Sequence, residues 1–230
     1  MGDIVVVKFS SRALAIERGA TLELRPIIDF ASSVRRLTES GSTVIVVAGG
    51  TGAHIYLDSA RAFAASEIVT HAIGAHIVMA NTQVLWSALR QAGCEVAPII
   101  AATGQEIELG VRQSAVVVVG PLPTALSTDS VAALAAEHCH ASTLLFLKKG
   151  RIYDIDPSRA VAEISAERLC AIAAEGPQLA GRTPPLDVYA ARIIERSRIP
   201  AAFMLYTDAR LLDAVIRGEA VSSLTRVTFD

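Results

Sequence analysis

The stretch from residue 115 to residue 157 contains residues that could hold an anionic ligand. It begins with an apolar, β-branched run at 115–119, which predicts a short buried strand. A loop broken by glycine and proline follows, and then Ser127-Thr128-Asp129, three residue types that favour the start of a helix. The run 143–147 predicts the next strand. Such a unit would place Asp129 at the carboxyl edge of a sheet beside a helix N-terminus, where open α/β sheets bind anionic ligands.

A glycine-rich segment follows another predicted strand, 43–47, and reads Gly49-Gly50-Thr51-Gly52-Ala53-His54. Glycines at this place let the backbone approach a ligand and direct N–H groups at phosphate oxygens, although a tight turn would have the same composition. The spacing matches neither the dinucleotide-binding fingerprint nor the Walker loop. The segment therefore indicates phosphate binding without identifying a known nucleotide-binding class.

A lysine stands at the end of the first predicted strand, Ile4–Val7, and is followed by Phe9-Ser10-Ser11. Lys8 either extends its ammonium group from the strand end into solvent or supplies positive charge to phosphoryl groups. The residues alone leave both interpretations open.

Strands and helices alternate along the chain. Helices are expected at 31–37, 73–89, 187–196 and 211–216, and further strands at 96–100 and 201–205. Because no linker or repeat interrupts this alternation, the sequence predicts a single domain over residues 1–230. The expected fold is α/β, a three-layer α-β-α sandwich with a mostly parallel central sheet.

Composition excludes several classes of protein. The net charge of −2 provides no basic stripe, so nucleic-acid binding is not expected. No unbroken apolar run reaches the 18 or so residues that cross a bilayer, and the N-terminus lacks a signal-peptide pattern, so no membrane association is expected. The three widely spaced cysteines suit a reducing compartment, which favours a cytoplasmic protein.

Four segments, in the right order, resemble the amino acid kinase superfamily and, within it, the uridylate (UMP) kinases. Residues 6–14 are similar to the family's first strand and phosphate loop, and 46–54 to its glycine-rich second loop. Residues 127–133 resemble the pattern Thr-Thr-Asp-x-x-Ala-Ala, and 152–157 the nucleotide-side pattern Val-Tyr-x-x-Asp-Pro. Residues 185–187 and 193–200 resemble the C-terminal helix and strand of the archaeal-type enzymes.

The resemblance implies a kinase that uses ATP and Mg²⁺. Lys8 would stabilise charge between donor and acceptor phosphates, and Asp129 would orient Lys8 or hold the metal–nucleotide. Phosphate-binding roles would fall to Ser10, Ser11, Gly49, Gly50, Thr51 and Thr128. The acceptor would meet His54, His71 and Gly74, and the nucleotide would meet Lys148, Tyr153 and Asp156. No metal site built from protein ligands alone is expected.

The sequence also departs from the family's pattern. Ser11 stands where a glycine is usual, and His54 replaces the arginine that would grip the acceptor phosphate. A neutral imidazole cannot bind phosphate bidentately as an arginine does. His71 replaces the aspartate that recognises the acceptor ribose, and 147–151 replaces a threonine-containing turn. These departures put specificity for uridine monophosphate in question more than catalysis, because Lys8 and Asp129 are retained.

Two alternatives follow. The first is a protein like the molybdenum storage proteins, which share the fold and are resembled by 49–56 and 185–187, and which would bind molybdate or tungstate as well as ATP. Its oxyanion could be bound by some of the five histidines, His54, His71, His76, His138 and His140. For His138 and His140, however, the sequence favours a solvated helix end. The second is a nucleotide-binding pseudokinase. The family further implies a homo-oligomer, a hexamer or a hetero-oligomer with a paralogous subunit, in which the helix at 73–89 could be interface or core.

Overall fold

A computed structural model describes residues 2–10, 24–50, 52–122, 126–150, 152, 160–175 and 186–230. In this part of the chain, strands form one sheet in the order β3-β2-β1-β4-β6-β7-β5. Neighbouring strands are parallel except for β6 and β7, which confirms the expected α/β fold with a mostly parallel sheet. The strands are β1 (Ile4–Phe9), β2 (Thr43–Ala48), β3 (Val116–Val119), β4 (Thr143–Lys148), β5 (Glu163–Ser165), β6 (Ala201–Leu205) and β7 (Thr225–Thr228).

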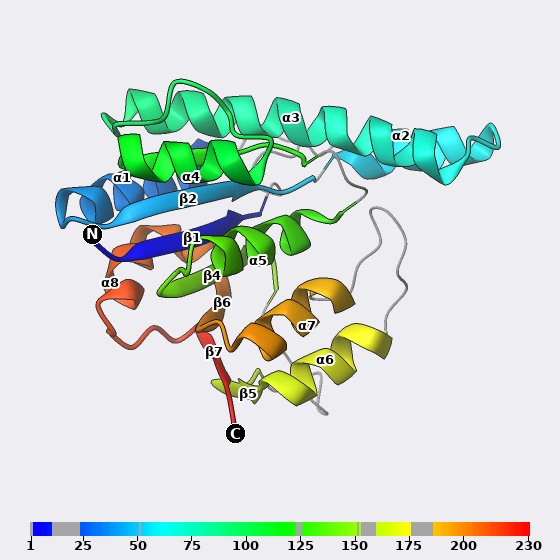
Figure 1. Cartoon of the computed structure of the whole chain (residues 1–230). Coiled ribbons are helices and arrows are strands. Elements are labelled where there is room, and N and C mark those ends of the chain that lie inside the picture. The colour runs from blue at the N-terminus through cyan, green and yellow to red at the C-terminus, as the bar shows by residue number, and fades with distance from the viewer. Residues whose placement is uncertain are drawn as a thin grey trace.

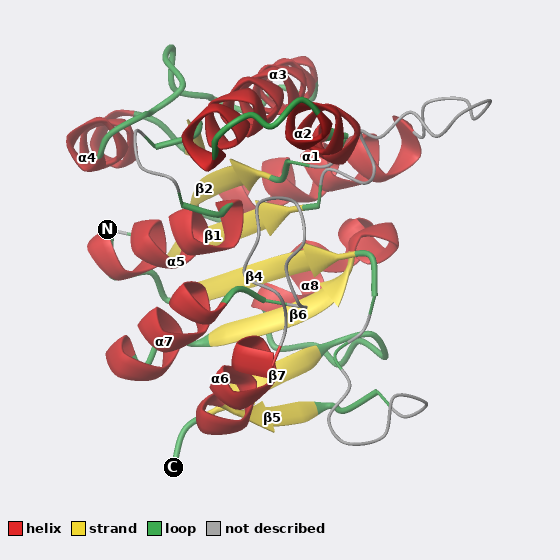
Figure 2. Cartoon of the chain, turned by 90° about the vertical axis from the view of Figure 1, so that its right-hand side faces the viewer, coloured by secondary structure: helices red, strands yellow, loops and turns green. Residues whose placement is uncertain are grey.

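Helices cover both faces of the sheet because successive strand side chains point to opposite sides. Val5 and Val7 pack with buried residues of α1 (Leu24–Glu39), α3 (Glu67–Gln91), the 3-10 helix η2 (Tyr206–Leu211) and α8 (Leu212–Ile216). Val6 and Phe146 pack on the opposite face with α4 (Gly104–Gln113), α5 (Thr128–His138), α6 (Ala166–Glu175) and α7 (Val188–Ser197). Figure 2 shows α5 and α7 on one side of the strands and α1 and α8 on the other. The three layers of the expected sandwich are therefore present.

α2 (Ala53–Ala62) and α3 form a hairpin that extends past the carboxyl ends of the strands (Figure 1). Apolar side chains near its tip are exposed, Phe63 by 88% and Ile68 by 80%. By length and composition alone, α3 is apolar enough to cross a membrane. Polar residues such as Asn81 separate its apolar residues, so the sequence contains no unbroken apolar run of that length. Leu85 and Leu89 nevertheless pack against the sheet, so this helix is part of the sandwich.

Several sequence predictions need correction. Residues 96–100 do not form a strand, and the segment 96–101 touches β3 only at two isolated bridges, Val96 to Val116 and Ala101 to Val119. Pro98 lies between the bridges and lacks the N–H that a continuous ladder needs. The closing helix predicted at 211–216 is present as α8, which begins at Leu212, and the 3-10 helix η2 precedes it without having been predicted. No local pattern predicted α2, α4, α6, β5 or β7.

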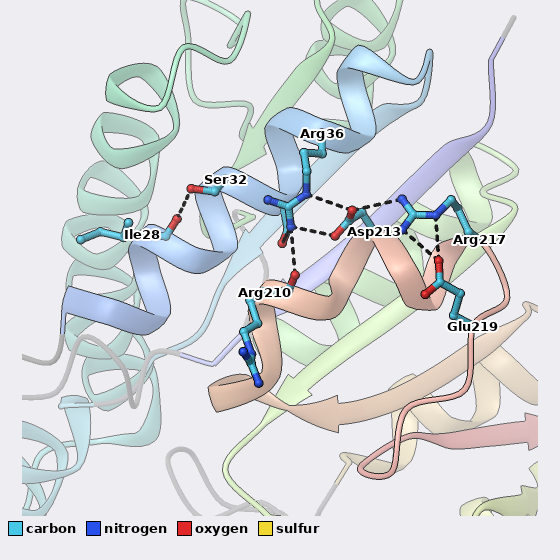
Figure 3. Close-up of polar contacts among 8 residues, drawn as sticks. Ile28, Ser32, Arg36, Arg210, Asp213, Arg217 and Glu219 are labelled. Carbon is cyan, nitrogen blue, oxygen red and sulfur yellow. Dashed lines mark hydrogen bonds and ion pairs between the residues drawn. The ribbon is translucent and has the colours of Figure 1, made fainter.

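An ionic network links α1 to η2 and α8 (Figure 3). Arg36 on α1 donates to both carboxylate oxygens of Asp213 on α8, at 2.9 and 2.8 Å, and to the backbone carbonyl of Arg210 at 2.9 Å. Arg217 donates to the same carboxylate at 3.1 Å. These hydrogen bonds hold the pKa of Asp213 down at about 2, despite the opposing effect of burial. The network connects the helix that follows β6 to the first helix of the same layer.

Candidate functional site

Lys8 and Lys148 lie on adjacent strands and face the same side of the sheet. In the parallel pairing of β1 with β4, Lys8 is opposite Phe146, and Lys148 follows two residues later at the end of β4. Since side chains alternate, both lysines share the face on which Phe146 packs against α5. Both also lie toward the carboxyl ends of their strands, as the sequence analysis expected for Lys8.

Asp129 lies between the two ammonium groups. Its Oδ1 is 3.1 Å from Lys8 Nζ, and its Oδ2 accepts a hydrogen bond of 2.6 Å from Lys148 Nζ. The three side chains are only 10%, 14% and 6% exposed for Lys8, Lys148 and Asp129. Two buried positive charges thus share one negative charge, and the group carries an excess of positive charge at the edge of the sheet.

The start of α5 explains the position of Asp129. Ser127 is the N-cap residue, and its hydroxyl accepts a hydrogen bond of 3.1 Å from the Ser130 N–H. Thr128 and Asp129 are therefore in the first turn, as the residue types predicted, and the positive end of the helix dipole adds to the charge of the lysines. The predicted helix start is confirmed.

Electrostatics keep the Asp129 carboxyl ionised at neutral pH. Burial by itself would raise the pKa of the Asp129 carboxyl, but the charges of Lys148 and Lys8 outweigh it and hold the pKa below its usual value. Burial, together with the charge of nearby Lys8 and against the opposing charge of Asp129, lowers the pKa of Lys148 to about 8. The Lys148 ammonium therefore loses its proton close to physiological pH.

Asp187 connects the start of α5 to the start of α7. Its Oδ1 accepts hydrogen bonds of 3.0 Å from the N–H groups of Tyr189 and Ala190, which caps α7. The same oxygen accepts a bond of 2.7 Å from Ser130 Oγ, and Oδ2 accepts one from Ser127 Oγ. One buried carboxylate thus joins the N-termini of two neighbouring helices, and it binds the two serines that flank Thr128 and Asp129.

The glycine segment follows β2 at the same edge of the sheet. The Gly49 N–H donates to the Phe9 carbonyl at 3.0 Å, which ties the segment to the end of β1. Asn81 on α3 donates its side-chain amide to the Gly49 carbonyl at 2.9 Å. Gly52 adopts a φ of +91° and begins α2 without a side-chain cap, so the first turn of α2 presents N–H groups at this end of the helix. Ser10 is buried just after β1, next to this segment.

The residues predicted to bind the acceptor all lie on the α2–α3 hairpin. His54 is exposed in the first turn of α2, and His71 is half-buried in α3. Gly74 faces Leu57, whose methyl group would lie 3.8 Å from a Cβ at that position. Within the described residues, none of these three forms a hydrogen bond or ion pair with Lys8, Asp129 or Lys148.

The histidines do not gather into one site. His138 lies at the end of α5 remote from Asp129 and pairs with Glu108 at 3.3 Å. Across the described ranges, no group of three or more histidine, cysteine or acidic side chains could hold a metal ion. The interpretation of His138 as part of a solvated helix end suits its half-exposed side chain.

Four predicted site residues lie outside the described ranges, namely Ser11, Thr51, Tyr153 and Asp156. Sequence reasoning also missed three features of the site. It assigned Lys148 to nucleotide binding without its contact to Asp129, and it gave no role to Asp187 or Asn81. Lys148 could have been paired with Lys8 from strand alternation, but the contacts of Asp187 and Asn81 join segments 57 and 32 residues apart and leave no local signal.

Comparison with known proteins agrees with this geometry. The sequence model of the amino acid kinase family matches residues 3–204. A uridylate kinase from Methanosarcina barkeri is 33% identical over 199 residues, which cover 84% of each chain. A uridylate kinase from Haloarcula marismortui is 31% identical over 223 residues, covering 94% of this chain and 95% of the relative.

A solved structure has the same fold over nearly the whole chain. The uridylate kinase from Archaeoglobus fulgidus superposes with a TM-score of 0.79 at 29% identity, covering 97% of this chain and 99% of that one. The UMP kinase from Ureaplasma parvum, at 17% identity and a TM-score of 0.75, supports the fold. These relatives give no support to the resemblance to molybdenum storage proteins.

Proposed function

Since the chain belongs to the amino acid kinase family, we propose that it transfers the γ-phosphoryl group of ATP to a nucleoside monophosphate, as a phosphotransferase of the uridylate kinase type. The observation that carries the proposal is the buried Lys8–Asp129–Lys148 group at the carboxyl edge of the sheet. Phosphoryl transfer depends on positioned counter-charge far more than on covalent chemistry by the protein. An excess of buried positive charge is suited to that task.

Each member of the group has a distinct role in this proposal. Lys8 and Lys148 contact phosphoryl oxygens and stabilise the charge that spreads over them in the transition state. Asp129 does not contact the reacting atoms but holds both ammonium groups in place. Because Lys8 and Lys148 come from strands and Asp129 from a capped helix, the charges are positioned before substrate binds.

Backbone N–H groups complete the phosphate site. The Gly49 N–H is bound to the Phe9 carbonyl, so of the two glycines expected at phosphate the N–H of Gly50 is proposed to bind the acceptor phosphate. Ser10 and Thr128 are proposed to bind phosphate oxygens near the two lysines. The acceptor itself would contact His54, His71 and Gly74 on the hairpin. The proposed roles of Ser11, Thr51, Tyr153 and Asp156, the first two at phosphate and the last two at the nucleotide, rest on the resemblance of their segments to the family.

The described residues do not form a magnesium site of their own. Asp129 is the carboxylate of the group, and both its oxygens already face ammonium ions, which disfavour a cation there. Mg²⁺ commonly binds through substrate phosphates and retains several waters. We therefore treat Mg²⁺ as part of the substrate, the Mg²⁺–ATP complex.

A panel assay tests the proposal. Purified protein is incubated with Mg²⁺–ATP and UMP, CMP, AMP or GMP, and formation of ADP and the nucleoside diphosphate is measured. Transfer to UMP is expected, and Lys8→Met should lower kcat by about 100- to 1000-fold. Binding of ATP without transfer to any acceptor would refute the kinase and leave the nucleotide-binding pseudokinase.

The exposed face of α3 supports an oligomer. The most apolar 18-residue window of this helix is only 17% buried, although its mean hydropathy is 1.2. Isolated apolar helix faces in water favour association. We propose a homo-oligomer in which α3 of one copy packs on another, in a cytoplasmic protein.

A further inference from the structure

We propose that Asn81 is a positioning residue that aims the Gly50 N–H at the acceptor phosphate. The inference rests on the proposed phosphotransferase function and adds a residue of α3 to it. Asn81 lies in the middle of α3 and reaches the carbonyl of Gly49, to which it donates at 2.9 Å. This hydrogen bond sets the orientation of the peptide group between Gly49 and Gly50.

The geometry of the peptide bond carries the argument. The peptide between Gly49 and Gly50 is trans, so its C=O and N–H point in opposite directions within one plane. Asn81 fixes the carbonyl toward α3, and the Gly50 N–H must then point away from α3. No described residue accepts a hydrogen bond from that N–H. Because α3 packs on the sheet face of Val5 and Val7, the opposite direction leads to the face of Val6, from which the Lys8 side chain projects.

Neighbouring contacts make the orientation specific. The Gly49 N–H is bound to the Phe9 carbonyl at 3.0 Å, and the Gly50 carbonyl accepts from the Ala53 N–H at 3.2 Å. Because the Gly49 N–H and the Gly50 carbonyl are both held, the rotation of the peptide plane between the two residues is the freedom that Asn81 restricts. Glycines allow such a plane to rotate because they lack a Cβ. A rotated peptide would turn the Gly49 carbonyl toward the phosphate and repel it.

Packing also requires α3 to lie close to this segment. A Cβ built on Gly50 would be 3.1 Å from Cγ2 of Val78, one turn before Asn81 on α3. The helix that carries the exposed apolar face is therefore in direct contact with the segment proposed to bind phosphate. A side chain at position 50 would require Val78 to shift, and this close approach of α3 lets the donor at position 81 reach Gly49.

Asn81→Asp tests the inference. The substitution keeps the shape of the side chain but replaces the donor by a carboxylate that repels the Gly49 carbonyl. KM for the acceptor should rise at least tenfold, while KM for ATP and the melting temperature change little. Thr82→Val is the matched control, because Thr82 is buried in the same helix and its hydroxyl bonds only to the Val78 carbonyl among described residues. Asn81→Ala, which removes the donor without adding charge, should raise the acceptor KM in the same direction.

The outcomes separate this inference from the proposed function. If the wild-type protein transfers phosphate and both Asn81 variants keep the wild-type acceptor KM, the inference is overturned and the kinase stands. If the KM values for acceptor and ATP rise equally while kcat and the melting temperature fall, Asn81 has a structural role, and the inference is overturned. If the wild-type protein has no transfer activity, titration calorimetry with UMP decides: weaker binding by Asn81→Asp supports the inference, and equal or undetectable binding by both proteins refutes it.

Discussion

The ammonium of Lys148 donates a hydrogen bond of 2.6 Å to Asp129, from the last residue of β4 to the first turn of α5. The contact joins a strand end to a helix start and completes the charged group around Lys8.

Replacing Lys148 tests whether this contact serves catalysis. Lys148→Met should lower kcat by about 100- to 1000-fold, because it removes a positive charge placed at the transferring group. Lys149→Met is the matched control, since the neighbouring lysine is exposed and lies outside the charged group. Steady-state kinetics with ATP and UMP measure the effect. Equal kcat in the two variants would contradict the role.

The pKa of Lys148 predicts a pH dependence. Because burial lowers this pKa to about 8, the ammonium loses its proton as the pH rises through that value. The kcat/KM of the wild-type protein, which reports the free enzyme, should therefore decline above about pH 8. Lys148→Arg keeps its charge and should move the decline to higher pH. An unchanged profile in this variant would assign the decline to another group.

Asp187 should affect both stability and catalysis. Asp187→Ala removes the cap of α7 and the partners of Ser127 and Ser130, which should lower the free energy of unfolding by about 2–4 kcal/mol. Because Asp129 follows Ser127 in the same turn, kcat should fall as well. Thr103→Ala removes the cap of α4, remote from the charged group, and should cost about 1 kcal/mol with kcat unchanged. Chemical denaturation and kinetics on the same samples separate the two effects.

The network around Asp213 predicts a loss of stability in acid. Arg36 and Arg217 hold the pKa of this carboxyl at about 2, below its value in an unfolded chain. The resulting stabilisation, about 2–3 kcal/mol, is present above about pH 4 and is lost as the pH falls toward 2. Asp213→Asn should flatten this part of the stability curve. Glu39→Gln, which alters an exposed ion pair with Arg35 on the same helix, should leave the curve unchanged.

A charge on the exposed face of α3 should disrupt assembly. Val84→Asp places a carboxylate on that face and should reduce the molecular mass measured by light scattering. Leu109→Asp is the control, since Leu109 is similarly exposed, 50% against 46%, but lies on α4. Unchanged mass in Val84→Asp would exclude this part of α3 from the interface.

Local patterns predicted the parts of the fold that depend on near neighbours. Apolar runs rich in β-branched residues predicted β1, β2, β3 and β4, Ser127 marked the start of α5, and the helix expected at 187–196 is α7. Short elements such as β5, with three residues, are too brief to produce a periodic signal. The apolar run at 96–100 suggested a strand, but Pro98 prevents the ladder.

The site was predictable where a charged residue stands next to a recognisable element boundary, as Lys8 does at the end of a strand and Asp129 at the start of a helix. The network of Asp187 was not, because a carboxylate that caps one helix gives no sign in the sequence of a second helix that shares it. The orientation of a peptide plane by Asn81 is likewise a tertiary effect, set by how α3 lies over β2.

The register of β1 against β4 limits how this protein can diverge. Lys8 and Lys148 are separated by the spacing of two hydrogen-bonded strands, which loop insertions elsewhere leave unaltered. The C-terminal half of α3 is fixed to this framework by Asn81, Leu85 and Leu89, whereas the tip of the hairpin around Phe63 is exposed and can vary in length and sequence. Substrate preference can therefore drift in evolution, or be redesigned, by changing the outer part of the hairpin while the charge separation of the transfer site stays constant.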